Sequence, residues 1–93
     1  MPLFRFHFRQ GLELVLDRDG LDCRDLGAAK HEAIRGARSI FSAQVLEGKL
    51  CLDESIDVHD ASGELVWTVT FGNAVEITHS TPANRGRLLN QAA

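Results

Sequence analysis

The stretch from Asp25 to Glu47 constrains the fold more than any other part of the sequence, because it alone is long and periodic enough to form a full helix. At 100° per residue, its apolar side chains fall on one broad stripe and its polar side chains fall opposite. Asp25 is a suitable N-cap, and Gly48 is suited to end the helix. The stripe needs a second layer to pack against. It consists of Leu26, Ala29, Ala33, Ile34, Ala37, Ile40, Phe41 and Val45.

Short alternating segments lie on both sides of this helix. Residues 3–8 and 12–16 predict one β-hairpin, and residues 56–60 and 64–71 predict a second. The expected architecture is α+β: a two-layer β-β-α-β-β sandwich, with one helix on one face of a four-stranded antiparallel sheet. The side chains expected to be buried against the helix are Phe4, Phe6, Phe8, Leu12, Leu14, Leu16, Ile56, Val58, Leu65, Trp67, Val69 and Phe71.

The first hairpin has a predicted register. Opposed residues share a face of the sheet, so Phe8 should face a leucine and not Glu13. A three-residue loop, 9–11, meets this condition by placing Phe8 against Leu12, and it puts a glycine where such loops need one. The same register places His7 opposite Glu13.

The second hairpin is treated in the same way. Opposing Val58 to Leu65 leaves a four-residue loop and places His59 opposite Glu64. After a Gly72-Asn73 turn, residues 75–77 fit either a fifth strand or a short helix, and their periodicity does not decide between the two.

Length and composition describe one small domain with an ordinary balance of residues. The chain has 93 residues, of which 44% are apolar and 25% charged, and its net charge is −3. No apolar run approaches the roughly 20 residues of a membrane span, and the alternating, arginine-containing start is unlike a signal peptide. We therefore expect a cytoplasmic protein, with a single domain over residues 1–79 and a tail over 80–93.

The two cysteines, Cys23 and Cys51, stand at opposite ends of the predicted helix. A helix of this length spans about 30 Å, whereas a disulfide needs Cα atoms within about 7 Å. Both thiols are expected to be free within one chain.

Residues 17–20, with the sequence D-R-D-G, begin like a calcium-binding loop. The complete EF-hand pattern requires glycine at its sixth position and glutamate at its twelfth. Asp22 and Ala28 occupy those positions. An Asp-Gly turn is therefore the preferred interpretation.

Several short motifs resemble a known family. They are the opening M-P-L-F-R-F-H, Asp17…Gly20, Asp25-Leu26…Ala29…Glu32-Ala33, Asp60…Gly63…Leu65 and Val69…Phe71…Ala74-Val75. Together they resemble a family of small bacterial proteins known only as a domain of unknown function. The resemblance implies the β-β-α-β-β plan. It carries over no functional residue and leaves the tail outside.

The first candidate site is the open face of the sheet, which one helix leaves uncovered. That face is either a solvated surface with cross-strand charge pairs or a homodimer face or ligand platform. Asp17 and Asp57 are expected there, and two histidines can form a metal or acid–base site only if their strands are neighbours. The candidate interaction residues are Arg5, His7, Arg9, Val15, His59, Val66 and Thr68.

The second candidate site is the polar face of the helix, where His31, Arg35 and Arg38 form a small basic patch. It is either a solvated face or an anion or nucleic-acid contact, although nucleic-acid binding usually shows a larger positive footprint or exposed aromatics.

No motif for a nucleophile or for a metal site occurs in the sequence, so we predict no catalytic residue, cofactor or metal. The expected function is a small cytoplasmic interaction module that forms a homodimer through the open face or the Leu88-Leu89 tail. The alternative is a weak nucleic-acid or anion binder that uses the helix face. An enzyme and a membrane protein are both disfavoured.

Overall fold

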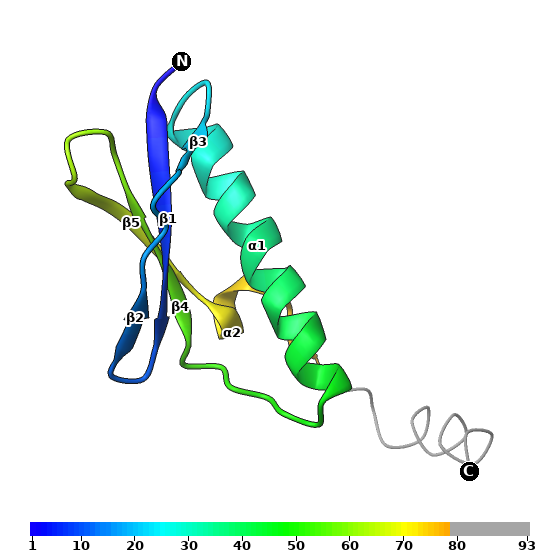
Figure 1. Cartoon of the computed structure of the whole chain (residues 1–93). Helices are drawn as coiled ribbons and strands as arrows, with labels where there is room; N and C mark the ends of the chain where they lie inside the picture. The colour runs from blue at the N-terminus through cyan, green and yellow to red at the C-terminus, as the bar shows by residue number, and fades with distance from the viewer. Residues whose placement is uncertain (79–93) are drawn as a thin grey trace, which may run out of the picture.

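The computed structural model describes residues 1–78, which form one sheet and one long helix beside it (Figure 1). This arrangement confirms the predicted α+β architecture. The elements are β1 (Leu3–Gln10), β2 (Glu13–Val15), β3 (Leu21–Asp22), α1 (Leu26–Leu46), β4 (Ser55–His59), β5 (Leu65–Thr70) and α2 (Phe71–Ala74).

The sheet is antiparallel, with its strands in the order β2-β1-β4-β5. The first strands of the two hairpins, β1 and β4, are therefore central neighbours. The two-residue strand β3, which the sequence did not predict, also pairs with β1. This order brings the alternating polar residues of β1 and β4 together.

Helix α1 begins and ends where the capping residues predict. The Asp25 carboxylate accepts a hydrogen bond from the Ala28 amide at 2.8 Å. At the other end, Gly48 donates to the Val45 carbonyl at 3.0 Å and Lys49 donates to the Gln44 carbonyl at 2.8 Å. These two bonds form a Schellman motif.

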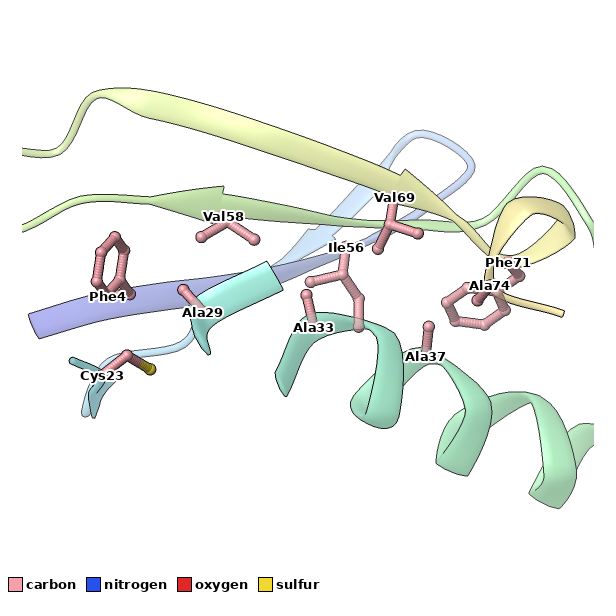
Figure 2. Packing of buried hydrophobic residues seen from close by; sticks show 10 residues of the cluster. All are labelled: Phe4, Cys23, Ala29, Ala33, Ala37, Ile56, Val58, Val69, Phe71 and Ala74. Carbon is pink, nitrogen blue, oxygen red and sulfur yellow. The ribbon is translucent and has the colours of Figure 1, made fainter. Parts of the chain in front are cut away.

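The core lies between α1 and one face of the sheet. Three alanines on successive turns of the helix, Ala29, Ala33 and Ala37, point at the sheet in Figure 2 and are fully buried. Their small side chains let the helix lie close to β4, so that Ile56 and Val58 fill the space between the layers. The rest of the buried cluster is Phe4, Cys23, Val69, Phe71 and Ala74.

The predicted register of the first hairpin is wrong. Gln10 pairs with Glu13 and Phe8 pairs with Val15, so the turn contains only Gly11 and Leu12. Gly11 has φ +62°, which suits the tight two-residue turns that match strand twist. Leu12, Leu14 and Leu16, expected in the core, are exposed as a result.

The predicted register of the second hairpin is also wrong, because β5 carries a bulge. Val58 pairs with Trp67 and His59 pairs with Leu65, which leaves Val66 as the extra residue. Val66 packs against the core cluster, whereas Leu65 is exposed. The bulge thus exchanges the two side chains relative to strict alternation.

A short helix, α2, directly follows β5 at Phe71–Ala74, where a strand end and a turn were expected, and residues 75–77 form neither the fifth strand nor the short helix considered for them. The Thr70 hydroxyl accepts a hydrogen bond from the Asn73 amide at 3.3 Å and caps α2. Phe71, the first residue of α2, is fully buried, and its amide donates to the Glu54 carbonyl at 2.8 Å. The side chain therefore reaches the core from a helix, where the sequence placed it on a strand.

Both cysteines have free thiols, as predicted. Cys23 is buried in the core cluster and Cys51 is partly buried. In the described part of the chain, neither helix combines the length and the apolar character that crossing a bilayer requires. The Leu88-Leu89 pair and the predicted boundary at residue 79 lie outside the described residues.

Candidate functional site

The open face of the sheet carries a cluster of polar side chains from three strands and one loop. We call it the polar cluster, and it comprises His7, Arg9, Asp17, Asp57, His59 and Thr68. The strand order creates it, because β1 and β4 pair side by side in the middle of the sheet. The strands of His7 and His59 are therefore neighbours, which an interaction between the two histidines requires.

One half of the cluster is an ion pair at the carboxylate of Asp57. Arg9 donates to Asp57 Oδ2 from Nη2 at 2.8 Å and from Nε at 3.1 Å. Thr68 Oγ1 donates to Asp57 Oδ1 at 3.1 Å. The Asp57 side chain is only 5% exposed, so these bonds compensate for the loss of water around its charge. Together they link β1, β4 and β5 across the face.

The other half of the cluster is a pair of imidazoles. The ring centroids of His7 and His59 lie 4.7 Å apart, with the planes inclined by 54°. The expected partners, Glu13 and Glu64, do not face them. His7 pairs with Asp57, and His59 lies between Arg5 and Leu65. The corrected registers of both hairpins account for this difference.

Asp17, in the loop after β2, joins the histidine pair to the edge of the sheet. Its amide donates to His7 Nδ1 at 2.9 Å. Its carboxylate accepts from the Phe6 amide and from the Gly20 amide, both at 3.1 Å. Asp17 therefore fills the gap along β1 between the residues that pair with β2 and those that pair with β3.

The surroundings shift the pKa values of the His7 imidazole and the Asp17 carboxyl group. Desolvation by burial lowers the pKa of His7 from its ordinary value of 6.5, and His59 and Arg5 lower it further against the opposing effect of Asp17 and Asp57. For Asp17, desolvation acts to raise the pKa, but the amides of Phe6, Gly20 and Asp19 outweigh it, so its pKa lies below 3.8. The fold therefore favours neutral His7 beside ionised Asp17.

His59 differs from His7 in its hydrogen bonding. Its Nδ1 atom is buried and has no hydrogen-bond partner among residues 1–78. Within the same residues, no three histidine, cysteine, aspartate or glutamate side chains are grouped so that they can hold a metal ion. What the cluster offers chemically is two imidazoles in contact, one of them bonded to a backbone amide.

Two candidates for the open face lie elsewhere. Val15 pairs with Phe8 and so shares the side of the sheet that faces the helix. Val66 packs on the core because of the bulge. The other five candidates lie on the open face as expected: Arg5, His7, Arg9, His59 and Thr68. The apolar margins of this face are Leu14, which pairs with Arg9, and Leu65, which pairs with His59.

The basic patch on α1 is largely engaged within the protein. Arg35 pairs with Glu32 one turn earlier, at 3.1 Å. Arg38 Nε donates to the Ala74 carbonyl at 2.7 Å and so caps the end of α2. His31 is exposed beside a shallow pocket near the start of α1. The two arginines thus have partners already, which weakens the support for a phosphate-binding surface.

The feature that the sequence interpretation missed is the outer edge of β2. Leu14, Val15 and Leu16 are 42%, 54% and 58% exposed, and Leu12 in the turn is fully exposed. In the described residues, β2 pairs only with β1. The sequence L-E-L-V-L carries the signal, but alternation alone does not distinguish a strand that packs on a core from an exposed edge strand.

The fold is that of a small α+β domain, in which an antiparallel sheet of β2, β1, β4 and β5, with the short β3 also paired to β1, has one long helix on one side. A family profile described as a domain of unknown function, DUF6894, matches residues 3–72. The chain belongs to this family, in agreement with the resemblance seen in its motifs. Neither a curated protein nor a solved structure matches the chain.

Proposed function

We propose that this protein is a small interaction module that forms a homodimer by pairing the outer edge of β2 with the same edge of a second copy. The observation that carries the proposal is the row of exposed leucines along that edge, Leu12, Leu14 and Leu16. An unpaired edge strand offers free amide and carbonyl groups to another chain, and a soluble domain seldom leaves several large apolar side chains side by side without use.

The spacing of these leucines makes the edge complementary to itself. In an antiparallel pairing with the two-fold axis at Leu14, the Leu14 side chains of both copies are directly opposed. Leu12 of each copy then lies opposite Leu16 of the other copy. Because Leu14 and Leu16 are two apart, their side chains share one face of the joined sheet, and Leu12 in the turn extends the row at its end.

The open face by itself supports a dimer less well. Its charged groups satisfy each other, as in the Arg9–Asp57 pair, and they leave little that a partner would complete. Leu14 lies on the same side as Arg9 and connects the edge to this face. A stable contact needs more than about 1,000 Å² of buried surface in total, so the leucines and the adjoining margin of the open face must both take part.

The two free cysteines support a reducing compartment, such as the cytoplasm, as the place where the dimer forms. Intermolecular disulfides are then not required for association.

Sedimentation equilibrium across micromolar concentrations tests the proposal. We expect the wild type to dimerise and Leu14→Lys to be monomeric, because lysine on an edge strand opposes pairing. Leu46→Lys is the matched control, since Leu46 is 87% exposed at the far end of α1, and it should dimerise like the wild type. A wild type that stays monomeric, or a Leu14→Lys variant that still dimerises, would refute the edge pairing.

A further inference from the structure

The loop that follows β2 is attached to β1 mainly through one residue, Asp17. Three hydrogen bonds meet at Asp17: its carboxylate holds the amides of Phe6 and Gly20, and its own amide donates to His7 Nδ1 at 2.9 Å. Arg5 Nε adds a longer contact, 3.5 Å, to the Arg18 carbonyl. The position of the loop therefore depends on the groups that surround Asp17.

The bond to His7 exists in only one protonation state. Because Nδ1 accepts the Asp17 amide proton, neutral His7 carries its own proton on Nε2. A second proton must bind Nδ1, which then becomes a donor that faces another donor. Protonation of His7 and the bond to Asp17 thus exclude each other.

We propose that His7 is a proton-controlled latch, which holds the loop after β2 against β1 when neutral and releases it when protonated. This inference rests on the proposed function where it concerns the dimer, since Leu16 lies between β2 and Asp17 and belongs to the leucine row. Release of Asp17 frees Leu16, so acid should weaken the pairing of β2 edges as well as the loop itself.

Charged and titratable groups surround the latch on each element that packs against it. Arg5 lies on β1, His59 and Asp57 on β4, and Asp17 in the loop. Arg9 is neutralised by Asp57, and β5 contributes the uncharged Thr68. Burial, His59 and Arg5 oppose a proton on His7 more than the two carboxylates favour it, so the pKa of His7 lies below 6.5.

The sign of the pH effect follows from this shift. Because the pKa of His7 is lower in the folded state than in the unfolded state, its contribution to stability is complete above pH 6.5. That contribution is lost as the pH falls from 6.5 toward the folded-state pKa. The central β1–β4 pairing and the alanine face of α1 do not involve Asp17. Release should therefore be local, with the sheet and helix intact.

The test follows the Asp17 and Gly20 amides by NMR between pH 7.5 and 5, in the monomeric Leu14→Lys background. We expect His7 to be the Nε2–H tautomer at pH 7.5, and the shift of the Asp17 amide to change with the same midpoint as the His7 ring. Hydrogen-exchange protection of the Asp17 amide should fall about fivefold, as for the loss of one hydrogen bond.

Two variants at position 7 make the comparison specific. Asparagine places a non-titrating acceptor near the position of Nδ1, so His7→Asn should keep the Asp17 amide bonded and abolish its pH response. His7→Leu removes the acceptor, so it should show the released state at every pH. His31→Gln, on the exposed face of α1, should behave like the parent.

The outcomes separate the two proposals. An Asp17 amide that ignores the titration of His7, or a His7→Asn variant that responds to pH like the parent, overturns the latch even if the wild type dimerises. If the Asp17 amide follows the titration of His7 but the wild type is always monomeric, the edge pairing is refuted and the local latch stands. In dimeric wild type, the dissociation constant should rise below pH 6.5 and remain flat in His7→Asn.

Discussion

Replacing Phe71 with alanine should lower the free energy of unfolding by about 3–5 kcal/mol. The ring is fully buried, stacks on Phe8 with centroids 5.6 Å apart, and meets the edge of Phe41 at 6.1 Å. Removing roughly 150 Å² of buried aromatic surface, at about 25 cal/mol per Å², costs about 4 kcal/mol. The Phe71 amide keeps its bond to Glu54 in the variant, so the loss reflects packing alone.

Urea denaturation measures this loss, with the single tryptophan, Trp67, as the fluorescent probe. A domain of this length has about 5–14 kcal/mol of stability, so the variant should remain partly or wholly folded and its midpoint measurable. Phe71→Leu should cost less than Phe71→Ala, and Leu46→Ala, at an exposed site, should differ from wild type by under about 0.5 kcal/mol. A Phe71→Ala variant within about 1 kcal/mol of wild type would refute the assignment of this ring to the core.

Two further predictions concern other contacts. In the same urea assay, Gly20→Ala should lower the stability more than Gly48→Ala. Both glycines have positive φ (+72° and +85°), but only the Cβ added at Gly20 meets a backbone atom, the Phe4 carbonyl oxygen at 2.8 Å. Equal losses of stability would show that the loop does not rest on β1. Cys23 should react with a thiol reagent much more slowly than Cys51 in the folded protein, because Cys23 is buried and its pKa is raised by desolvation and then by Glu32, Asp22 and Asp25; equal rates in the native state would contradict the burial of Cys23.

The helix was predictable because its signals are local. Asp25, the alanine stripe and Gly48 act within one or two turns of the chain, and the structure uses each of them as expected. The alternation of β4 was equally informative, since Ile56 and Val58 lie under the helix and are buried. The ends of the helix and the buried face of β4 therefore follow from nearby residues and do not depend on the strand order.

The register of the first hairpin was not predictable in the same way, because burial of its leucines does not decide it. The helix packs on β4 and β5 and leaves β2 at the margin of the sheet (Figure 1). No second layer is available for Leu14 or Leu16 there, so the turn geometry at Gly11 decides the register. The assumption that every leucine in an alternating segment is buried fails at an edge strand.

The candidate site depended on information that alternation does not contain. Contact between His7 and His59 requires that β1 and β4 be neighbours, which follows from strand order and not from either segment alone. Trp67 illustrates the same limit: it was expected to be a buried core residue, but it is partly buried with Lys30 Nζ 5.4 Å from its ring centroid. Phe71, which reaches the core from α2, is the better probe of packing.

The D-R-D-G segment shows how one short motif serves the whole edge of the sheet. Both carboxylate oxygens of Asp17 face N–H groups, which would repel a calcium ion as they attract the carboxylate. Gly20 supplies the positive φ that turns the chain back along β1, and its lack of a Cβ lets it approach the Phe4 carbonyl. The motif is therefore an Asp-Gly turn that fixes the segment between β2 and β3 to one strand, and its first residue carries the bond to His7 on which the proposed latch depends.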